Sequence, residues 1–255
     1  MNLQVIDSHI HCGIQDKFPP QDIESYRAAC KGTPIGGVVA FPPVSEVYDR
    51  YDPLFVDSPE WQVVRRRAHD YLLALASSMK DFIVYPFLFV WNDFAWKELD
   101  RGFKGIKWHR HADEPRYNYD DPECKIMIDE ICKRSMPVVL EEEFTETVAF
   151  VRERAAGVKV IIPHLGLLNG GYGRIKSEGL WDLPNVYADT ALADRFTIED
   201  YVRNYGVERL LFGSDFPFGN PKRELRKIMD LPISELEKDK IVRENVLNLL
   251  RQVRE

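Results

Sequence analysis

The 255-residue sequence has few of the features that mark exported, membrane-bound or nucleic-acid-binding proteins. Its four cysteines show no C-x-x-C spacing, so they indicate neither a disulfide scaffold nor a cysteine zinc site. No apolar run is long enough to cross a bilayer, and we expect no signal peptide after Met1. No lysine- and arginine-rich tract interrupts a chain of net charge −7, which argues against nucleic acid or an anionic membrane as a partner. We therefore expect a cytoplasmic protein with reduced thiols.

What the sequence does contain is a regular alternation of short apolar runs and longer amphipathic segments. The apolar runs predict eight strands, at residues 3–9, 35–41, 82–90, 103–109, 137–142, 158–164, 185–190 and 209–214. Their interiors are almost continuously apolar, as expected for strands that are buried on both faces of a parallel sheet. Helical periodicity predicts helices at residues 58–79, 121–134, 145–156, 197–205, 221–229 and 234–252.

Eight strand-then-helix units in about 250 residues predict a (β/α)8 TIM barrel, formed as a single domain by residues 1–255. An open doubly wound sheet is the alternative, but no G-x-G-x-x-G or P-loop motif follows a strand. Longer irregular segments follow four of the strand ends, at 13–21, 42–57, 110–120 and 166–183. In a barrel these segments lie at the carboxyl-terminal mouth, where active sites of this fold form.

The most informative motif is the His9-Ile10-His11 sequence at the end of the first expected strand. Side chains alternate along a strand, so the two imidazoles point the same way. Two neutral imidazoles on one face are suitable ligands for a divalent transition metal. The alternative is a pair of histidines that only form hydrogen bonds at a strand end.

Ionisable residues recur at the ends of four later strands. They are Lys107 and His109 on the fourth strand, the acidic run 141–143 on the fifth, His164 on the sixth and Asp215 on the eighth. A closed barrel brings these side chains into one pocket at its mouth. Imidazoles and carboxylates are the ligand types of hydrolytic metal sites, so this set indicates metal-dependent chemistry.

With these residues the chain resembles the amidohydrolase superfamily, in particular its amidohydrolase-related branch of metal-dependent hydrolases and nonoxidative decarboxylases. The resemblance rests on motifs at residues 6–11, 102–109, 137–140, 161–166, 211–217 and 240–247. It implies a divalent metal, zinc or alternatively manganese, present as one or two ions and bound by His9, His11 and Asp215. It also implies that Asp215 acts as a general base, and that His164 polarises the reacting group or shuttles a proton.

The fifth strand departs from the family pattern, which often reads Pro-Val-x-x-His. Glu141 occupies the histidine position, and a carboxylate can also ligate a divalent metal. Glu143 shares its face and is the alternative ligand, whereas Glu142 is expected to point outward. A solvated start of a loop is the alternative interpretation of Glu142 and Glu143. Lys107 is either a carboxylated lysine that bridges two metals or, as we favour, a lysine paired with Glu141 or Asp215.

Substrate recognition is expected from residues at the barrel mouth, with Lys107, His109, Arg110 and Arg174 as the candidates. An arginine guanidinium forms paired hydrogen bonds with a carboxylate, so an anionic small molecule is the expected substrate class. The alternative interpretations are that the two arginines are solvated surface residues and that His109 is a partly exposed loop residue.

Three functions are consistent with these residues. The preferred one is hydrolysis of a small ester, lactone or amide by a metal-activated water. The second is nonoxidative decarboxylation of an aromatic or unsaturated carboxylic acid. The third is a barrel that binds a ligand without catalysis, against which His9, His11, His164 and Asp215 argue. The resemblance also suggests a homodimer.

Overall fold

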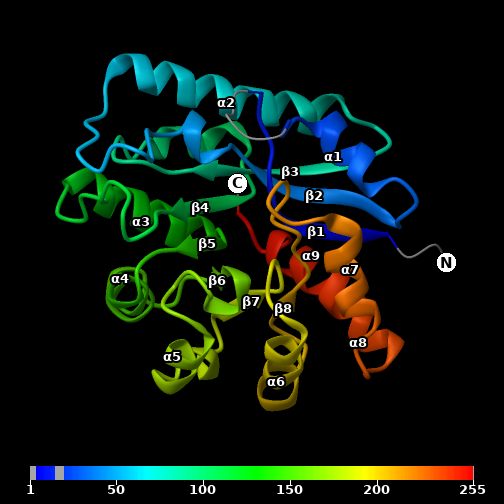
Figure 1. Ribbon diagram of the computed structural model, residues 1–255. Helices are drawn as coiled ribbons and strands as arrows, with labels where there is room; N and C mark the ends of the chain where they lie inside the picture. The colour runs from blue at the N-terminus through cyan, green and yellow to red at the C-terminus, as the bar shows by residue number, and fades with distance from the viewer. Residues whose placement is uncertain (1–3, 15–19, 255) are drawn as a thin grey trace.

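The computed structural model describes residues 4–14 and 20–254, and within them eight strands alternate with helices along the chain (Figure 1). The strands are β1 (Val5–His11), β2 (Ile35–Phe41), β3 (Ile83–Phe89), β4 (Gly105–His109), β5 (Val138–Glu141), β6 (Val160–Ile162), β7 (Val186–Asp189) and β8 (Leu210–Leu211). Each strand pairs in parallel with the next, in the order β1 to β8.

The two edges of this sheet meet. Ile10 of β1 forms a parallel bridge with Phe216, which follows β8, and the backbone N–H of Ser8 donates to the carbonyl oxygen of Phe212 at 2.8 Å. These contacts nearly close the sheet into a cylinder. The predicted (β/α)8 TIM barrel is therefore confirmed.

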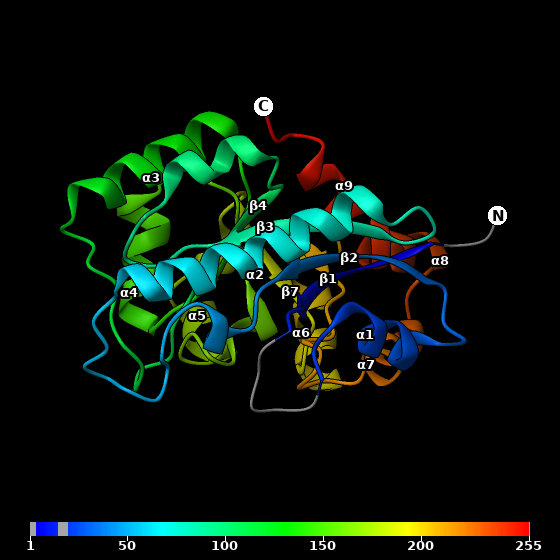
Figure 2. The same cartoon turned by 90° about the horizontal axis from the view of Figure 1, so that it is seen from above.

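Helices cover the outside of the barrel (Figures 1 and 2). They are α1 (Ile23–Cys30), α2 (Pro59–Ser78), α3 (Pro122–Arg134), α4 (Phe144–Ala149), α5 (Tyr172–Ser177), α6 (Arg195–Tyr205), α7 (Pro221–Met229), α8 (Glu235–Asp239) and α9 (Asn245–Leu250). The long helix α2 lies over β2 and β3, while α1 and α7 lie side by side although they are far apart in the sequence. None of the described helices combines the length and apolar character needed to span a membrane.

Local signals start several of these helices. Ser58 caps α2 by accepting a hydrogen bond from the backbone N–H of Trp61 at 3.3 Å, and a proline follows it at the first helical position. Ser234 and Glu237 form the capping box of α8 that their spacing favours. The predicted helix 145–156 ends in a π-helical turn at Phe150–Arg154, and the predicted helix 234–252 is interrupted by one at Lys240–Glu244.

Two predicted strands, β6 and β8, end two and three residues earlier than expected, and two helices, α1 and α5, were not predicted. The strand expected at 158–164 stops at Ile162 because His164 and Leu165 have positive φ values of 57° and 50°. The strand expected at 209–214 is shortened to Leu210–Leu211. Helix α1, which Asp22 caps, lies in a stretch to which the sequence analysis assigned no element.

The core has an inner and an outer layer. The outer layer fills the space between the strands and the helices. The inner layer comprises Ile6, Val39, Phe41, Phe87, Val139, Ile161, Leu211, Val246, Leu249 and Leu250, the last three contributed by α9. The Phe41 ring lies 4.9 Å from the His9 ring and 4.6 Å from Lys107 Nζ. The inner apolar layer therefore ends directly against the cluster of ionisable residues.

Candidate active site

His9 and His11 share one face of β1, as predicted, and both contact Asp215. Each histidine places its Nε2 atom 3.4 Å from Asp215 Oδ1. Asp215 has a positive φ of 54°, and its backbone N–H donates to the carbonyl oxygen of His9 at 2.8 Å. The backbone contact across the barrel seam thus fixes Asp215 beside the histidine pair.

The Nδ1 atom of each imidazole, on the side of the ring away from Asp215, faces a hydrogen-bond acceptor. His9 Nδ1 lies 2.7 Å from Asp189 Oδ2, and His11 Nδ1 lies 3.3 Å from the carbonyl oxygen of Pro42. These acceptors favour the tautomer with hydrogen on Nδ1, which leaves both Nε2 lone pairs directed at Asp215. This is the arrangement in which metal-binding histidines are usually held.

The donor atoms of His9, His11 and Asp215 have the spacing of a metal site. They lie within 4.8 Å of one another, and all three residues are buried. A tetrahedral ion with bonds of about 2.1 Å spaces its ligand atoms by about 3.4 Å, which matches the two distances to Asp215. The residues therefore fit a divalent transition metal.

The charge states also suit a cation. Burial and then the Lys107 ammonium lower the pKa of His9, so its imidazole is neutral and free to ligate. Burial would raise the pKa of Asp215, but the contact with His11 and the other nearby histidines lower it to about 2. Asp215 is consequently an ionised carboxylate near neutral pH.

Asp189 is a site residue that the sequence analysis missed. Besides binding His9, its Oδ1 accepts the backbone N–H groups of His164 at 2.9 Å and Ala191 at 3.0 Å. Burial opposes its ionisation, but the contact with His9 lowers the pKa of Asp189 overall. Its position at the end of the predicted seventh strand was the available signal.

Lys107 and Glu141 form the buried ion pair that the sequence favoured. Lys107 Nζ lies 3.0 Å from Glu141 Oε2 and 3.5 Å from His9 Nε2. Glu141 also contacts His109 and His111 through Oε1, at 3.2 and 2.7 Å. The carboxylate is thus surrounded by cationic and imidazole groups, and Lys107 lies next to both His9 and Glu141. A metal-ligand role for Glu141 stays a prediction.

His164 projects into the same cluster. Its Nδ1 lies 3.0 Å from the carbonyl oxygen of Ala191, and its Nε2 lies 3.5 Å from Glu141 Oε2. Burial would lower the pKa of His164, but the contact with Glu141 and the Asp215 and Asp189 charges raise it to about 9. His164 is therefore protonated near neutral pH. Its ring lies beside that of His9, with the ring centroids 4.9 Å apart.

The expected substrate-binding arginines bind groups of the protein itself. Arg110 is buried, and its Nη1 donates to Glu142 and to Glu143, each at 2.6 Å. Arg174 lies over the Phe144 ring at 4.0 Å. Both guanidinium groups thus have partners outside the histidine cluster, and their role toward a substrate stays a prediction.

The solvated interpretation of Glu142 is wrong. Its side chain is fully buried, and it accepts hydrogen bonds from Arg110 and, at 2.9 Å, from the Tyr119 hydroxyl. The reason is that Arg110 and Tyr119 come from the segment after β4, a non-local partner that the acidic run does not reveal. Glu143 remains partly exposed, with 31% of its side-chain surface accessible.

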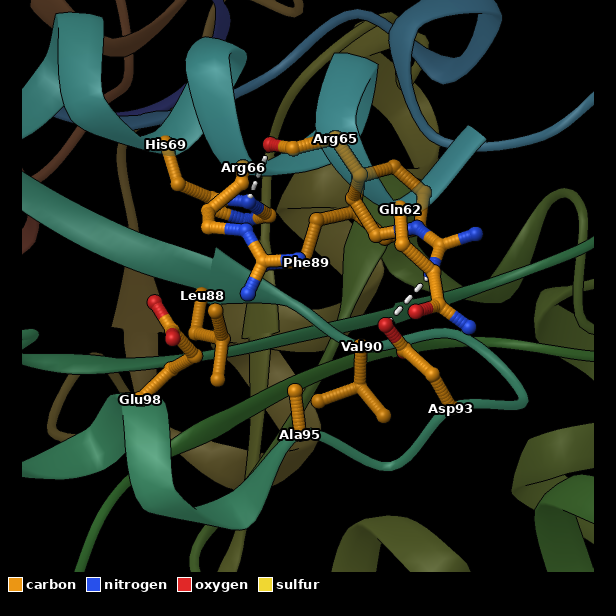
Figure 3. A pocket seen from close by; sticks show the side chains of 10 residues that line it. All are labelled: Gln62, Arg65, Arg66, His69, Leu88, Phe89, Val90, Asp93, Ala95 and Glu98. Carbon is orange, nitrogen blue, oxygen red and sulfur yellow. Dashed lines mark hydrogen bonds and ion pairs between the residues drawn. The ribbon is translucent and has the colours of Figure 1, made fainter. Parts of the chain in front are cut away.

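A separate hollow lies between α2 and β3 (Figure 3). Arg65 and His69 of α2 face Phe89 and Asp93 across it, and Arg65 Nη1 pairs with Asp93 at 2.6 Å. Its volume of about 30 Å³ has room for about two water molecules. None of the side chains drawn there is a predicted site residue, so this hollow belongs to the joint between α2 and β3.

Comparison with known proteins agrees with this architecture. The sequence model of the Amidohydrolase family matches residues 6–252. A search of curated proteins finds no match. The fold is similar to that of 2,6-dihydroxybenzoate decarboxylase from Rhizobium, with 18% identity over 97% of this chain and 98% of that chain and a TM-score of 0.73.

Two further solved structures share the fold. A putative 2-pyrone-4,6-dicarboxylic acid hydrolase from Pseudomonas putida has 15% identity, covers 98% of each chain and has a TM-score of 0.72. A dihydroxybenzoic acid decarboxylase from Polaromonas sp. JS666, with bound manganese and the inhibitor 2-nitroresorcinol, has 16% identity, 97% coverage of each chain and a TM-score of 0.69. At such identities the similarity is one of fold.

Proposed function

We propose that this chain, which belongs to the amidohydrolase family, is a divalent-metal-dependent enzyme that acts on a small carboxylated molecule at the barrel mouth. The observation that carries the proposal is the convergence of His9 Nε2 and His11 Nε2 on one oxygen of Asp215, each at 3.4 Å. His9, His11 and Asp215 would hold the metal, with zinc or manganese as the candidates and Glu141 as a further candidate ligand. A metal bound there would supply Lewis acidity and a water of lowered pKa.

The charge states of the protein groups favour hydrolysis of an ester, lactone or amide. Asp215 is ionised, so it is suited to accept a proton from an attacking water. His164 is protonated and is suited to donate a hydrogen bond or a proton to the reacting carbonyl or the leaving group. Asp189 keeps the His9 ring in place during these transfers. The Phe41 ring, packed against both His9 and Lys107, excludes water from beneath the site.

Nonoxidative decarboxylation is the second candidate, and the comparisons support it at least as strongly. Two of the similar structures described above are decarboxylases of dihydroxybenzoates. In such a reaction the carboxylate of an aromatic acid leaves as carbon dioxide and a proton replaces it on the ring carbon. His164 is the better proton donor for that step, because the pKa of Asp215 is held at about 2. Lys107 would stabilise the substrate carboxylate.

One assay distinguishes the two reactions. Protein reconstituted with zinc or with manganese is incubated with aryl esters and lactones, and separately with hydroxybenzoates, while carbon dioxide release is recorded. Ester or lactone cleavage without carbon dioxide supports the hydrolase, and carbon dioxide from the acids supports the decarboxylase. The Asp215→Asn variant is the control and is expected to lose turnover while keeping its fold. Activity that is unchanged in this variant would rule out both mechanisms.

A further inference from the structure

A second cluster of two histidines and one carboxylate lies beside the first. His109 ends β4, His111 follows two residues later, and both direct Nε2 at Glu141 Oε1, at 3.2 and 2.7 Å. The three donor atoms lie within 4.8 Å of one another. We propose that His109, His111 and Glu141 form a second transition-metal site, distinct from the one at His9, His11 and Asp215.

The Nδ1 atom of His109, on the side of the ring away from Glu141, faces a hydrogen-bond acceptor, which leaves Nε2 for ligation. His109 Nδ1 lies 3.2 Å from the Tyr48 hydroxyl oxygen, and that hydroxyl donates its own hydrogen to Glu114 Oε2 at 2.7 Å. The Tyr48 oxygen is therefore available to accept a hydrogen bond from His109 Nδ1–H. This tautomer leaves the Nε2 lone pair facing Glu141.

Glu114 also contacts His111. His111 Nδ1 lies 3.6 Å from Glu114 Oε1, and its backbone N–H donates to Glu114 Oε2 at 2.9 Å. Arg50 pairs with Glu114 and also places Nη2 3.2 Å from His111 Nδ1. Ligation through Nε2 puts hydrogen on Nδ1, so Arg50 must then donate to Glu114 alone. Glu114 thus links the outer sides of both rings, as Asp189 holds His9 in the first cluster.

The two oxygens of Glu141 have different partners. Oε2 faces Lys107 at 3.0 Å and His164 at 3.5 Å, whereas Oε1 faces the histidine pair. Glu141 can therefore bind an ion through Oε1 while Lys107 holds the other oxygen. Lys107 also lies 3.5 Å from His9 Nε2, so an ammonium group separates the two clusters. Because like charges repel, the second ion is expected to bind more weakly than the first.

Ligand chemistry and access favour a particular class of ion. Two imidazoles and one carboxylate suit zinc and other first-row transition metals, whereas magnesium and calcium prefer oxygen ligands. His109 and Glu141 are buried, but 30% of the His111 side-chain surface is accessible, which gives an ion a path from solvent. The inference does not depend on which reaction the first site performs.

The test counts and locates zinc ions. Metal-free protein is titrated with zinc, passed through a desalting column, and analysed for zinc per chain, and crystals soaked in zinc are measured at the zinc absorption edge. The wild type is expected to bind two equivalents. The His111→Gln variant should retain one, with anomalous density only at His9 and His11. The matched His9→Gln/His11→Gln variant should also retain one, with density only at His109 and His111.

The outcomes separate this inference from the proposed function. A single wild-type ion at His9 and His11 would overturn the second site and leave the proposed function intact. Two ions in the His111→Gln variant would also overturn it. A single wild-type ion at His109 and His111 would support the second site and contradict the first. Because His111 is partly exposed, its replacement should leave the circular-dichroism melting curve of the metal-free protein unchanged. If it does not, His109→Gln is the second variant, and it is expected to lose one equivalent while keeping anomalous density at His9 and His11.

Discussion

One carboxylate, that of Asp189, contacts two histidines of this site. Asp189 contacts His9 Nδ1 at 2.7 Å and also accepts the backbone N–H of His164 at 2.9 Å. It therefore connects a candidate metal ligand to a candidate proton donor. Because partners of this kind tune metal affinity without touching the ion, the effect of removing the Asp189 charge can be measured directly.

We expect the Asp189→Asn variant to bind zinc about 10- to 100-fold more weakly than the wild type. The asparagine keeps an oxygen for the backbone N–H groups of His164 and Ala191, but it loses the negative charge that faces His9. Competition with a chromophoric chelator measures the zinc affinity. Asp194→Asn, at the exposed N-cap of α6, is the matched control. Equal affinity in the wild type and Asp189→Asn would contradict this role.

The sequence predicted those features of single residues that follow from their neighbours in the chain, and missed those that depend on contacts with distant segments. The alternation of a strand was enough to predict that His9 and His11 share a face. Asp189 carries no motif, so only its place after an apolar run marked it. Glu142 was misinterpreted because its partners Arg110 and Tyr119 lie in a different segment of the chain. A local pattern cannot show such a contact.

Strands and helices are joined by buried polar contacts as well as by apolar packing. Arg110 connects the segment after β4 to the end of β5 through Glu142 and Glu143. His69 connects α2 to β3, because its Nε2 accepts the backbone N–H of Phe89 at 2.8 Å while its Nδ1 lies 2.8 Å from the carbonyl oxygen of Arg65. Breaking either contact is expected to lower the free energy of unfolding by a measurable amount.

The Arg110→Met variant is expected to lower the free energy of unfolding by about 3–5 kcal/mol, because Glu142 is left buried without its charged partner. Adding Glu142→Gln should recover part of this loss, since the uncompensated charge is removed. Urea unfolding of the wild type, both single variants and the double variant gives the coupling energy. Additive effects of the two substitutions would contradict a direct interaction.

Acid should weaken the joint at His69. Burial lowers the pKa of His69 to about 3 in the folded state, whereas an unfolded histidine has a pKa of about 6.5. The stability that the neutral ring contributes is complete above about pH 6.5 and is lost as the pH falls toward 3, because only the unfolded chain binds the proton.

From pH 7 to pH 5 we expect His69 to account for about 2 kcal/mol of lost unfolding free energy. The His69→Gln variant, which does not titrate there, should lose that much less than the wild type over the same interval. Urea unfolding at the two pH values measures the difference. Parallel losses in the two proteins would show that His69 is not the group responsible.

The element boundaries show where sequence patterns are informative. The strand Ile35–Phe41 and the helix Pro221–Met229 agree with the prediction at both ends, because an apolar run and a proline start mark them. The end of β6 was misplaced because left-handed backbone at His164 and Leu165 is not encoded by glycine. Helices α1 and α5 were not predicted, because they contain only eight and six residues.

At the scale of the whole molecule, closure of the barrel creates the site. His9 and Asp215 come from opposite ends of the sequence, and they meet because Ile10 pairs with Phe216 across the seam between β1 and β8. Fold class and the convergence of strand ends were predictable from the repeating pattern. The separate grouping of His109 and His111 around Glu141 was not, because it depends on side-chain directions around Lys107 and Glu141. The homodimer suggested by the resemblance stays a prediction.

The central claim is that His9, His11 and Asp215 bind a divalent metal. It is tested most directly by the metal content per chain of protein purified without added metal or chelator, measured by inductively coupled plasma mass spectrometry beside the Asp215→Asn variant. The account predicts at least one equivalent of zinc or manganese in the wild type and a loss of one equivalent in the variant. A wild-type protein that holds no metal, and takes up none on reconstitution, would contradict it.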